Sequence, residues 1–169
     1  MFSGNFLKFL GVFLVIMLAA GGGFFVWERY LSPQAKLNLE AQANYQKYLD
    51  WEANYEKAMR EDTYGGKTPQ ETLDMFVAAL RAGDVELASK YFMLNTGGKI
   101  DEKWINGLKK TKEEGKLLEV TDLLSKALPA GSSMKGYFGF EIRDNAGNLL
   151  NDINLELNEY SGIWKIRSL

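Results

Sequence analysis

The sequence contains neither cysteine nor histidine, and these two absences narrow the chemistry that the chain can perform. Both residue types number zero among its 169 residues. Without cysteine there is no disulfide, no thiolate zinc or iron–sulfur site and no cysteine nucleophile. Without histidine the chain lacks the usual general base and the commonest ligand of transition metals. Ser-His-Asp and Cys-His catalysis within this chain are therefore excluded, and we expect no catalytic residue, no metal and no cofactor.

The sequence also lacks an excess of charge of either sign. It has 20 Lys and Arg against 22 Asp and Glu, which gives a formal net charge of −2. A domain that binds nucleic acid normally has a basic surplus on one face, so we expect no nucleic-acid partner. Apolar residues make up 46% of the chain and charged residues 25%, which is typical of a folded globular domain.

One long apolar run interrupts this average composition near the N-terminus. The 19 residues from Phe9 to Trp27 include no charge. At about 1.5 Å per residue such a helix spans roughly 28 Å, close to the hydrocarbon thickness of a bilayer. Trp27 and Tyr30 suit the aromatic belt at a membrane surface. We therefore predict a membrane anchor over residues 1–30, with span residues that include Phe9, Leu14, Ile16, Phe24 and Trp27.

A cleaved signal peptide is the alternative interpretation of this segment. Lys8 would be its basic region, and Ala19, Ala20 and Gly21 would form a small-residue cleavage site. The apolar run continues beyond that site to Trp27, which favours an anchor that stays attached. A short N-terminal flank before a long polar domain is typical of an N-in protein. We expect a single-pass protein of the cytoplasmic membrane with an extracytoplasmic C-terminal domain.

Residues 31–64 are predicted to form a juxtamembrane amphipathic helix. Ser32 is a suitable N-cap and Pro33 a suitable first helical residue, and neither Gly nor Pro occurs from Gln34 to Asp62. Aromatic and apolar residues recur at helical spacing and form one stripe. The stripe either packs on the chain's own domain or forms an oligomer contact. The candidate contact residues are Tyr45, Tyr48, Trp51 and Tyr55.

The remaining domain, residues 65–169, begins with three predicted helices. Thr68 and Glu71 form a capping box around Pro69, and Gly83 ends that first helix. Asp84 and Asp101 are suitable N-caps for the next two helices. The three helices are expected at residues 68–82, 85–93 and 101–115.

After Gly115 the apolar residues alternate in the manner of strands. Four strands are expected, around residues 118–124, 138–142, 153–157 and 164–166, with a loop at 129–133 and a hairpin turn at 144–147. Charged residues that include Lys165 are expected to blunt exposed strand edges. Helices followed by an antiparallel meander predict an α+β fold, in which three helices pack on a curved antiparallel sheet of about four strands.

Two segments of this domain resemble the nuclear transport factor 2-like superfamily of cystatin-like α+β cones. They are TPQETLDMFVAALRAGDVELASKYF, from Thr68 to Phe92, and the C-terminal NLLNDINLELNEYSGIWKIRSL. The likeness is to small bacterial exported members of unassigned function. It implies a curved sheet and helices that form a cone open at one end. Candidate lining residues for a cavity in that cone are Tyr91, Phe92, Trp104, Phe138, Phe140 and Trp164.

These features favour a non-catalytic interaction or assembly module held at a membrane, with a protein partner or a second copy of the chain bound to it. A small apolar ligand in the cone is the alternative function. An isomerase or dehydratase that uses a carboxylate and a tyrosine is less favoured, because no such pair stands out in the sequence.

Overall fold

A computed structural model describes residues 4–132 and 134–169, which divide into two compact units, Met1–Asp50 and Trp51–Leu169. The chain is α+β, with all its described helices preceding a four-stranded antiparallel sheet. The predicted α+β class is confirmed, and the sheet has four strands, although the first is not at the predicted residues.

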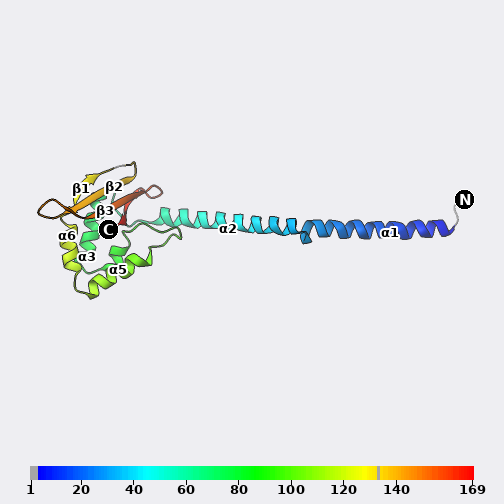
Figure 1. The fold of residues 1–169 in the computed structure, drawn as a ribbon, viewed down its shortest axis with the longest axis horizontal. Coiled ribbons are helices and arrows are strands. Elements are labelled where there is room, and N and C mark those ends of the chain that lie inside the picture. The colour runs from blue at the N-terminus through cyan, green and yellow to red at the C-terminus, as the bar shows by residue number, and fades with distance from the viewer. Residues whose placement is uncertain (1–3, 133) are drawn as a thin grey trace. The chain divides into compact units, whose positions relative to one another are not determined.

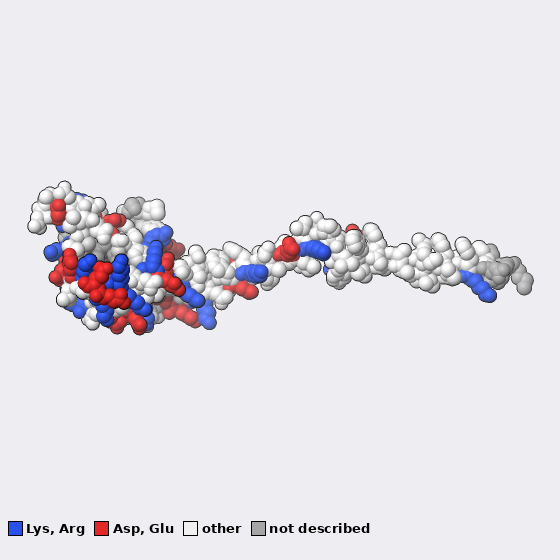
Figure 2. Space-filling view, turned by 60° about the horizontal axis from the view of Figure 1, so that its bottom comes forward, with Lys and Arg blue, Asp and Glu red and all other residues white. Residues whose placement is uncertain are grey.

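The first unit is helical and begins with the long apolar segment. It contains α1 (Gly4–Val26), the π-helix η1 (Trp27–Leu31) and the first part of α2 (Pro33–Glu61). Within the described residues, one helical stretch is long and apolar enough to cross a membrane. Figure 2 shows few charged side chains along this N-terminal helix and many on the C-terminal domain. The predicted start of α2 is confirmed, because the Ser32 hydroxyl accepts a hydrogen bond from the backbone N–H of Ala35.

After the end of α2, the described part of the second unit has four helices where three were predicted. The predicted capping box is present, since the side chains of Thr68 and Glu71 each bond the other's backbone N–H. Gly83 and Gly115 follow two of the helices with φ angles of 72° and 71°, a conformation that favours glycine. The helices are α3 (Pro69–Arg81), α4 (Val85–Ser89), α5 (Glu102–Glu113) and α6 (Leu117–Leu124).

The strand predicted over Leu118, Val120 and Leu124 is wrong, because this segment is helix α6. The buried residues are Leu117, Thr121 and Leu124, whose spacing of four and three residues is that of one helix face. The alternation of apolar and polar residues around Leu118 and Val120 therefore does not indicate a strand here.

The second predicted helix is shorter than expected and ends at Ser89 rather than Met93. The backbone after it pairs with the last strand. Ile166 donates its N–H to the carbonyl of Tyr91 and accepts a hydrogen bond from the N–H of Met93. Residues 91–93 thus cover an edge of the sheet that would otherwise be unpaired.

The sheet is a meander in which each strand pairs with the next along the chain. The prediction of a loop at 129–133 is wrong in its first part, because residues 128–131 pair with the second strand across a bulge. The predicted turn at 144–147 is confirmed, with Gly147 donating to the carbonyl of Asp144. The strands are β1 (Leu128–Gly131), β2 (Tyr137–Arg143), β3 (Leu149–Asn158) and β4 (Ile163–Ser168).

The hydrophobic core lies between the helices and one face of this sheet. Figure 1 shows α3, α5 and α6 gathered on the same side of the strands. Phe76 of α3 and Phe92 meet edge to face, with ring centroids 5.5 Å apart. On the sheet, Phe140 is paired with Ile153, and both are buried. Ile166 of β4 is fully buried in the same core.

Candidate functional site

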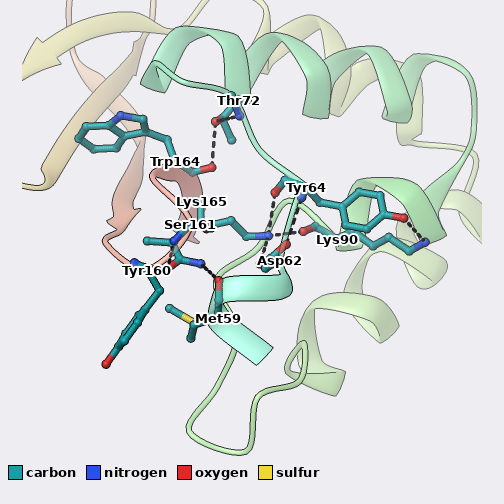
Figure 3. Close-up of polar contacts among 11 residues, drawn as sticks. Met59, Asp62, Tyr64, Thr72, Lys90, Tyr160, Ser161, Trp164 and Lys165 are labelled. Carbon is teal, nitrogen blue, oxygen red and sulfur yellow. Dashed lines mark hydrogen bonds and ion pairs between the residues drawn. The ribbon is translucent and has the colours of Figure 1, made fainter. Parts of the chain in front are cut away.

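A buried charge, which the sequence did not reveal, lies where the end of α2 meets the sheet. Lys165 was expected at an exposed strand edge, but its side chain is 0% exposed, so that expectation is wrong. Its ammonium lies 2.6 Å from Oδ2 of Asp62. It also donates to the carbonyls of Tyr64, at 2.8 Å, and Lys90, at 2.6 Å. Figure 3 shows these three oxygens around the ammonium, which has three protons to donate.

Asn158 and Thr72 extend this buried polar network, which we call the Lys165 cluster (Asp62, Tyr64, Thr72, Lys90, Asn158 and Lys165). The amide of Asn158 donates to the carbonyl of Met59 in the last turn of α2, at 2.8 Å. The hydroxyl of Thr72 donates to the carbonyl of Trp164, at 3.0 Å, and accepts from the N–H of Gly66, at 2.8 Å. Both side chains are fully buried. The cluster therefore fixes residues 59–66 against β3 and β4.

Burial dominates the electrostatics of this cluster. Loss of solvent lowers the pKa of Lys165 below its ordinary value of 10.5, and the hydrogen bond and charge of Asp62 oppose that shift. The ammonium is buried, donates to two backbone carbonyls and is paired with Asp62, so its contacts are all within the protein. We interpret the cluster as a set of structural contacts that attach the end of α2 to the sheet, rather than as a reaction centre.

The candidate cavity-lining residues Tyr91, Phe92, Trp104, Phe138, Phe140 and Trp164 all lie in the core or against it. Phe92 stacks on Trp104 with ring centroids 4.5 Å apart. Phe138 contacts both Phe140, at 5.1 Å, and Trp164, at 6.4 Å. The structure therefore brings five of these six residues together as two groups of rings in mutual contact.

The candidate oligomer residues of α2 fall into two pairs. Tyr45 and Tyr48 belong to the first unit and are 60% and 51% exposed. Trp51 and Tyr55 belong to the second unit and stack on each other, with centroids 5.8 Å apart. The indole N–H of Trp51 donates to the carbonyl of Thr96, at 2.6 Å. The second pair thus packs against the chain's own domain.

The candidate span residues Phe9, Leu14, Ile16, Phe24 and Trp27 lie along α1 and the start of η1, and all are exposed. Large apolar side chains between Phe6 and Val26 are 42% to 75% exposed. Every residue of this apolar segment whose burial is described is exposed.

A groove of about 550 Å³ opens on the surface of the second unit, and we call it the tyrosine groove (Tyr55, Met59, Asn95, Tyr137, Glu156, Tyr160 and Arg167, with their neighbours). Tyr55 from α2 meets Tyr160 edge to face, with centroids 6.5 Å apart. The guanidinium of Arg60 lies over the Tyr160 ring, 5.3 Å from its centroid. Burial, with Tyr160 and Glu156 nearby, raises the pKa of the Tyr55 hydroxyl.

Polar side chains form the other part of the tyrosine groove. The Tyr137 hydroxyl donates to Glu156 Oε1 at 3.2 Å, and Arg167 forms an ion pair with the second carboxylate oxygen. This is an acid beside a phenol, the arrangement that an isomerase would need. Both oxygens of this carboxylate are already engaged, one by the Tyr137 hydroxyl and the other by the guanidinium of Arg167. The sequence separates these residues widely and has no local motif that marks them.

Over residues 4–132 and 134–169, no group of three or more acidic, cysteine or histidine side chains is placed to hold a metal ion. Comparison of the chain with protein-family models, with curated proteins and with solved structures finds no match. The function must therefore be argued from the geometry of this chain alone.

Proposed function

We propose that this protein is a single-pass, membrane-anchored interaction module without catalytic activity. The N-terminus lies inside the cell and the C-terminal domain on the outer face of the cytoplasmic membrane. The observation that carries the proposal is the exposure of α1, an apolar helix of 23 residues.

An exposed helix of this kind is unfavourable in water. Burial of one large apolar side chain is worth about 1.5–3 kcal/mol, and this segment has more than ten such side chains without cover. A bilayer provides the cover, and a helix satisfies its own backbone hydrogen bonds in lipid. Trp27 and Tyr30 then lie near the interface, where aromatic side chains with a polar atom are favoured.

The second unit supports binding better than chemistry. Its rings pack into the core, its buried lysine is paired with Asp62 and bonded to two backbone carbonyls, and the carboxylate of its acid–phenol pair forms an ion pair with Arg167. Membrane tethering raises the effective concentration of such a domain, so a weak interface is sufficient for assembly. We place the domain in the nuclear transport factor 2-like superfamily as part of this proposal, because a capped helix pair precedes an antiparallel sheet.

Anchoring and orientation are tested on native membranes. After an alkaline carbonate wash, we expect the chain to remain in the pellet with an intact mass that includes residues 1–30. Protease added outside spheroplasts should digest the domain and leave cytoplasmic markers intact. A chain that begins near residue 21 and is released into the supernatant would contradict the anchor. Protection of the domain alongside the cytoplasmic markers would contradict the orientation.

Assembly is tested with single cysteines, because the natural chain has none to interfere. The variant Tyr45→Cys places a thiol on the exposed stripe of α2, and Leu118→Cys places a matched control on exposed α6. Oxidation in membranes should give a disulfide-linked dimer or a crosslinked partner for the first variant and neither for the second. Monomer alone for both, together with monomer alone after treatment with an amine-reactive crosslinker, would contradict assembly.

A further inference from the structure

The tyrosine groove is separate from the membrane segment and from the Lys165 cluster. It lies wholly within the second unit, between the end of α2, residues 93–96, residues 135–137 and the β3–β4 hairpin. Its volume of about 550 Å³ falls in the range of small-molecule sites, and it is open to solvent. We therefore considered which class of ligand its surface matches.

Aromatic rings that are already held in place form one wall of the groove. Tyr55 is fixed between Trp51, which stacks on it, and Tyr160, which meets it edge to face. Tyr160 is 43% exposed with the guanidinium of Arg60 over its ring, so part of the residue remains available to a ligand. The face of an aromatic ring carries negative potential and attracts weakly positive C–H groups. Such a wall suits a ligand with flat faces of C–H bonds.

Hydrogen-bonding groups lie beside these rings. The Tyr137 hydroxyl and the Glu156 carboxylate are held at 3.2 Å from each other. Arg167, paired with the same carboxylate, is 57% exposed and presents its guanidinium donors to the groove. Donors and acceptors fixed side by side match neighbouring hydroxyl groups, each of which both donates and accepts.

The charges of the lining balance. Lys135 and Arg167 contribute two cations, and Glu156 and Glu159 contribute two carboxylates, while Arg60 over the Tyr160 ring is paired with Glu56. A phosphate or a quaternary ammonium would meet no net opposite charge here, and an apolar ligand would displace water from the partly exposed polar groups without replacing its hydrogen bonds. A neutral ligand rich in hydroxyl groups meets neither objection.

We infer that the tyrosine groove is a binding site for a neutral saccharide, which stacks on Tyr160 and forms hydrogen bonds with Tyr137, Glu156 and Arg167. The inference goes beyond the proposed function, because it depends on neither the anchor nor a protein partner.

The test uses the full chain in lipid nanodiscs, which avoids sugar-based detergents. The probes are cellobiose, maltose and N,N′-diacetylchitobiose, with glucose 6-phosphate and indole as contrasting probes. Saturation-transfer NMR and calorimetric titration measure binding. We expect at least one disaccharide to bind saturably, and more tightly than either contrasting probe.

Matched variants locate the site. Tyr160→Ala should weaken the binding of that disaccharide about threefold to tenfold, the range expected for the loss of one ring contact. Tyr137→Phe, which removes only a hydroxyl group, should also weaken it severalfold. Tyr45→Ala, a change at an exposed tyrosine of the first unit, should leave it unchanged. If Tyr160→Ala does not fold, Tyr137→Phe decides the outcome alone.

Failure of all three disaccharides to saturate would overturn the inference. So would tighter binding of glucose 6-phosphate or indole, or disaccharide binding that neither groove variant alters. None of these results would affect the proposed anchor, which the carbonate wash and the intact mass measure separately.

Discussion

The ammonium of Lys165 and the carboxylate of Asp62 form an ion pair, 2.6 Å between Nζ and Oδ2, in which the two side chains are 0% and 6% exposed. Removal of two charges from water is costly, so such a pair adds little net stability compared with apolar residues of similar size. Removal of one partner alone is much more harmful, because it leaves an unpaired buried charge. The pair therefore acts mainly to specify where the end of α2 is attached.

We predict that Lys165→Met lowers the free energy of unfolding by about 3–5 kcal/mol, because it leaves the buried Asp62 carboxylate without its cation. The double variant Asp62→Leu with Lys165→Met should lose less than the sum of the two single variants. Urea unfolding of the full chain in nanodiscs, followed by tryptophan fluorescence, measures each value. Additive losses would show that the two side chains do not interact.

The same lysine should give the protein a pH-dependent stability. Burial lowers the pKa of Lys165 in the folded chain, whereas the unfolded chain titrates near 10.5. Between these two values the unfolded chain binds more protons, so the free energy of unfolding contributed by this group rises with pH. The slope from one group is at most about 1.4 kcal/mol per pH unit.

This slope is measured as the difference between the natural chain and Lys165→Met over about pH 8 to 10, below the unfolded-state pKa of lysine. The difference should increase with pH. Lys126→Met, at an exposed lysine, is the control, and its free energy of unfolding should change with pH as that of the natural chain does. A difference that is flat or that falls with pH would contradict the assigned direction. Burial raises the pKa of the Tyr55 and Tyr91 hydroxyls, so these two groups also make stability depend on pH. Their contribution is the same in both chains and cancels when the two free energies of unfolding are subtracted.

Gly65 is predicted to tolerate no side chain. A Cβ at this position would lie against the carbonyl oxygen of Trp164 and the side chain of Ile163. Gly65→Ala should therefore destabilise the domain by about 1–3 kcal/mol, as overpacking usually does. The matched control is Gly107→Ala, in an exposed part of α5 with no atom within 4 Å of the new Cβ. That change should stabilise the domain by up to about 1 kcal/mol through helix propensity, and equal effects of the two changes would refute the argument.

Arginine in the middle of α1 should impair membrane insertion. Leu14→Arg combined with Ile16→Arg places two charges near the centre of the apolar segment, each at a cost of about 2.5–3.5 kcal/mol on insertion scales. We expect most of the variant chain to be extracted by alkaline carbonate. Leu118→Arg, which adds a charge to an exposed residue of α6, should stay in the pellet. Retention of the double variant in the membrane pellet would contradict the proposal that α1 anchors the chain in the membrane.

Helix ends were the most predictable part of the fold, because they depend on neighbouring residues. Ser32, Thr68 with Glu71, and Asp101 each cap a helix where the sequence places one. The alternating residues of β3 likewise predicted a strand, with Ile153 and Leu155 buried. Local signals of this kind require no knowledge of the rest of the chain.

Features that depend on distant contacts could not be predicted. Leu118 and Val120 alternate like strand residues, but the face that packs on the core is set by Leu117 and Leu124. Lys165 is buried because Asp62 and the carbonyls of Tyr64 and Lys90, all distant in the sequence, surround its ammonium. From the sequence alone, a single lysine in a strand is normally expected to point into solvent. The tyrosine groove assembles Tyr55, Tyr137 and Tyr160 from three elements, and no spacing in the sequence links them.

Lys165 donates a hydrogen bond to the carbonyl of Tyr64, which lies 101 residues earlier. The contacts that attach the end of α2 to the sheet therefore cannot form until β4 has left the ribosome. During synthesis the apolar helix emerges first, long before the strand that completes the domain. The order of the chain thus leaves the domain incomplete while the apolar helix is already synthesised, which suits the membrane insertion that we propose. In the orientation proposed above, folding of the domain would be completed on the outer side of the membrane, once β4 has crossed.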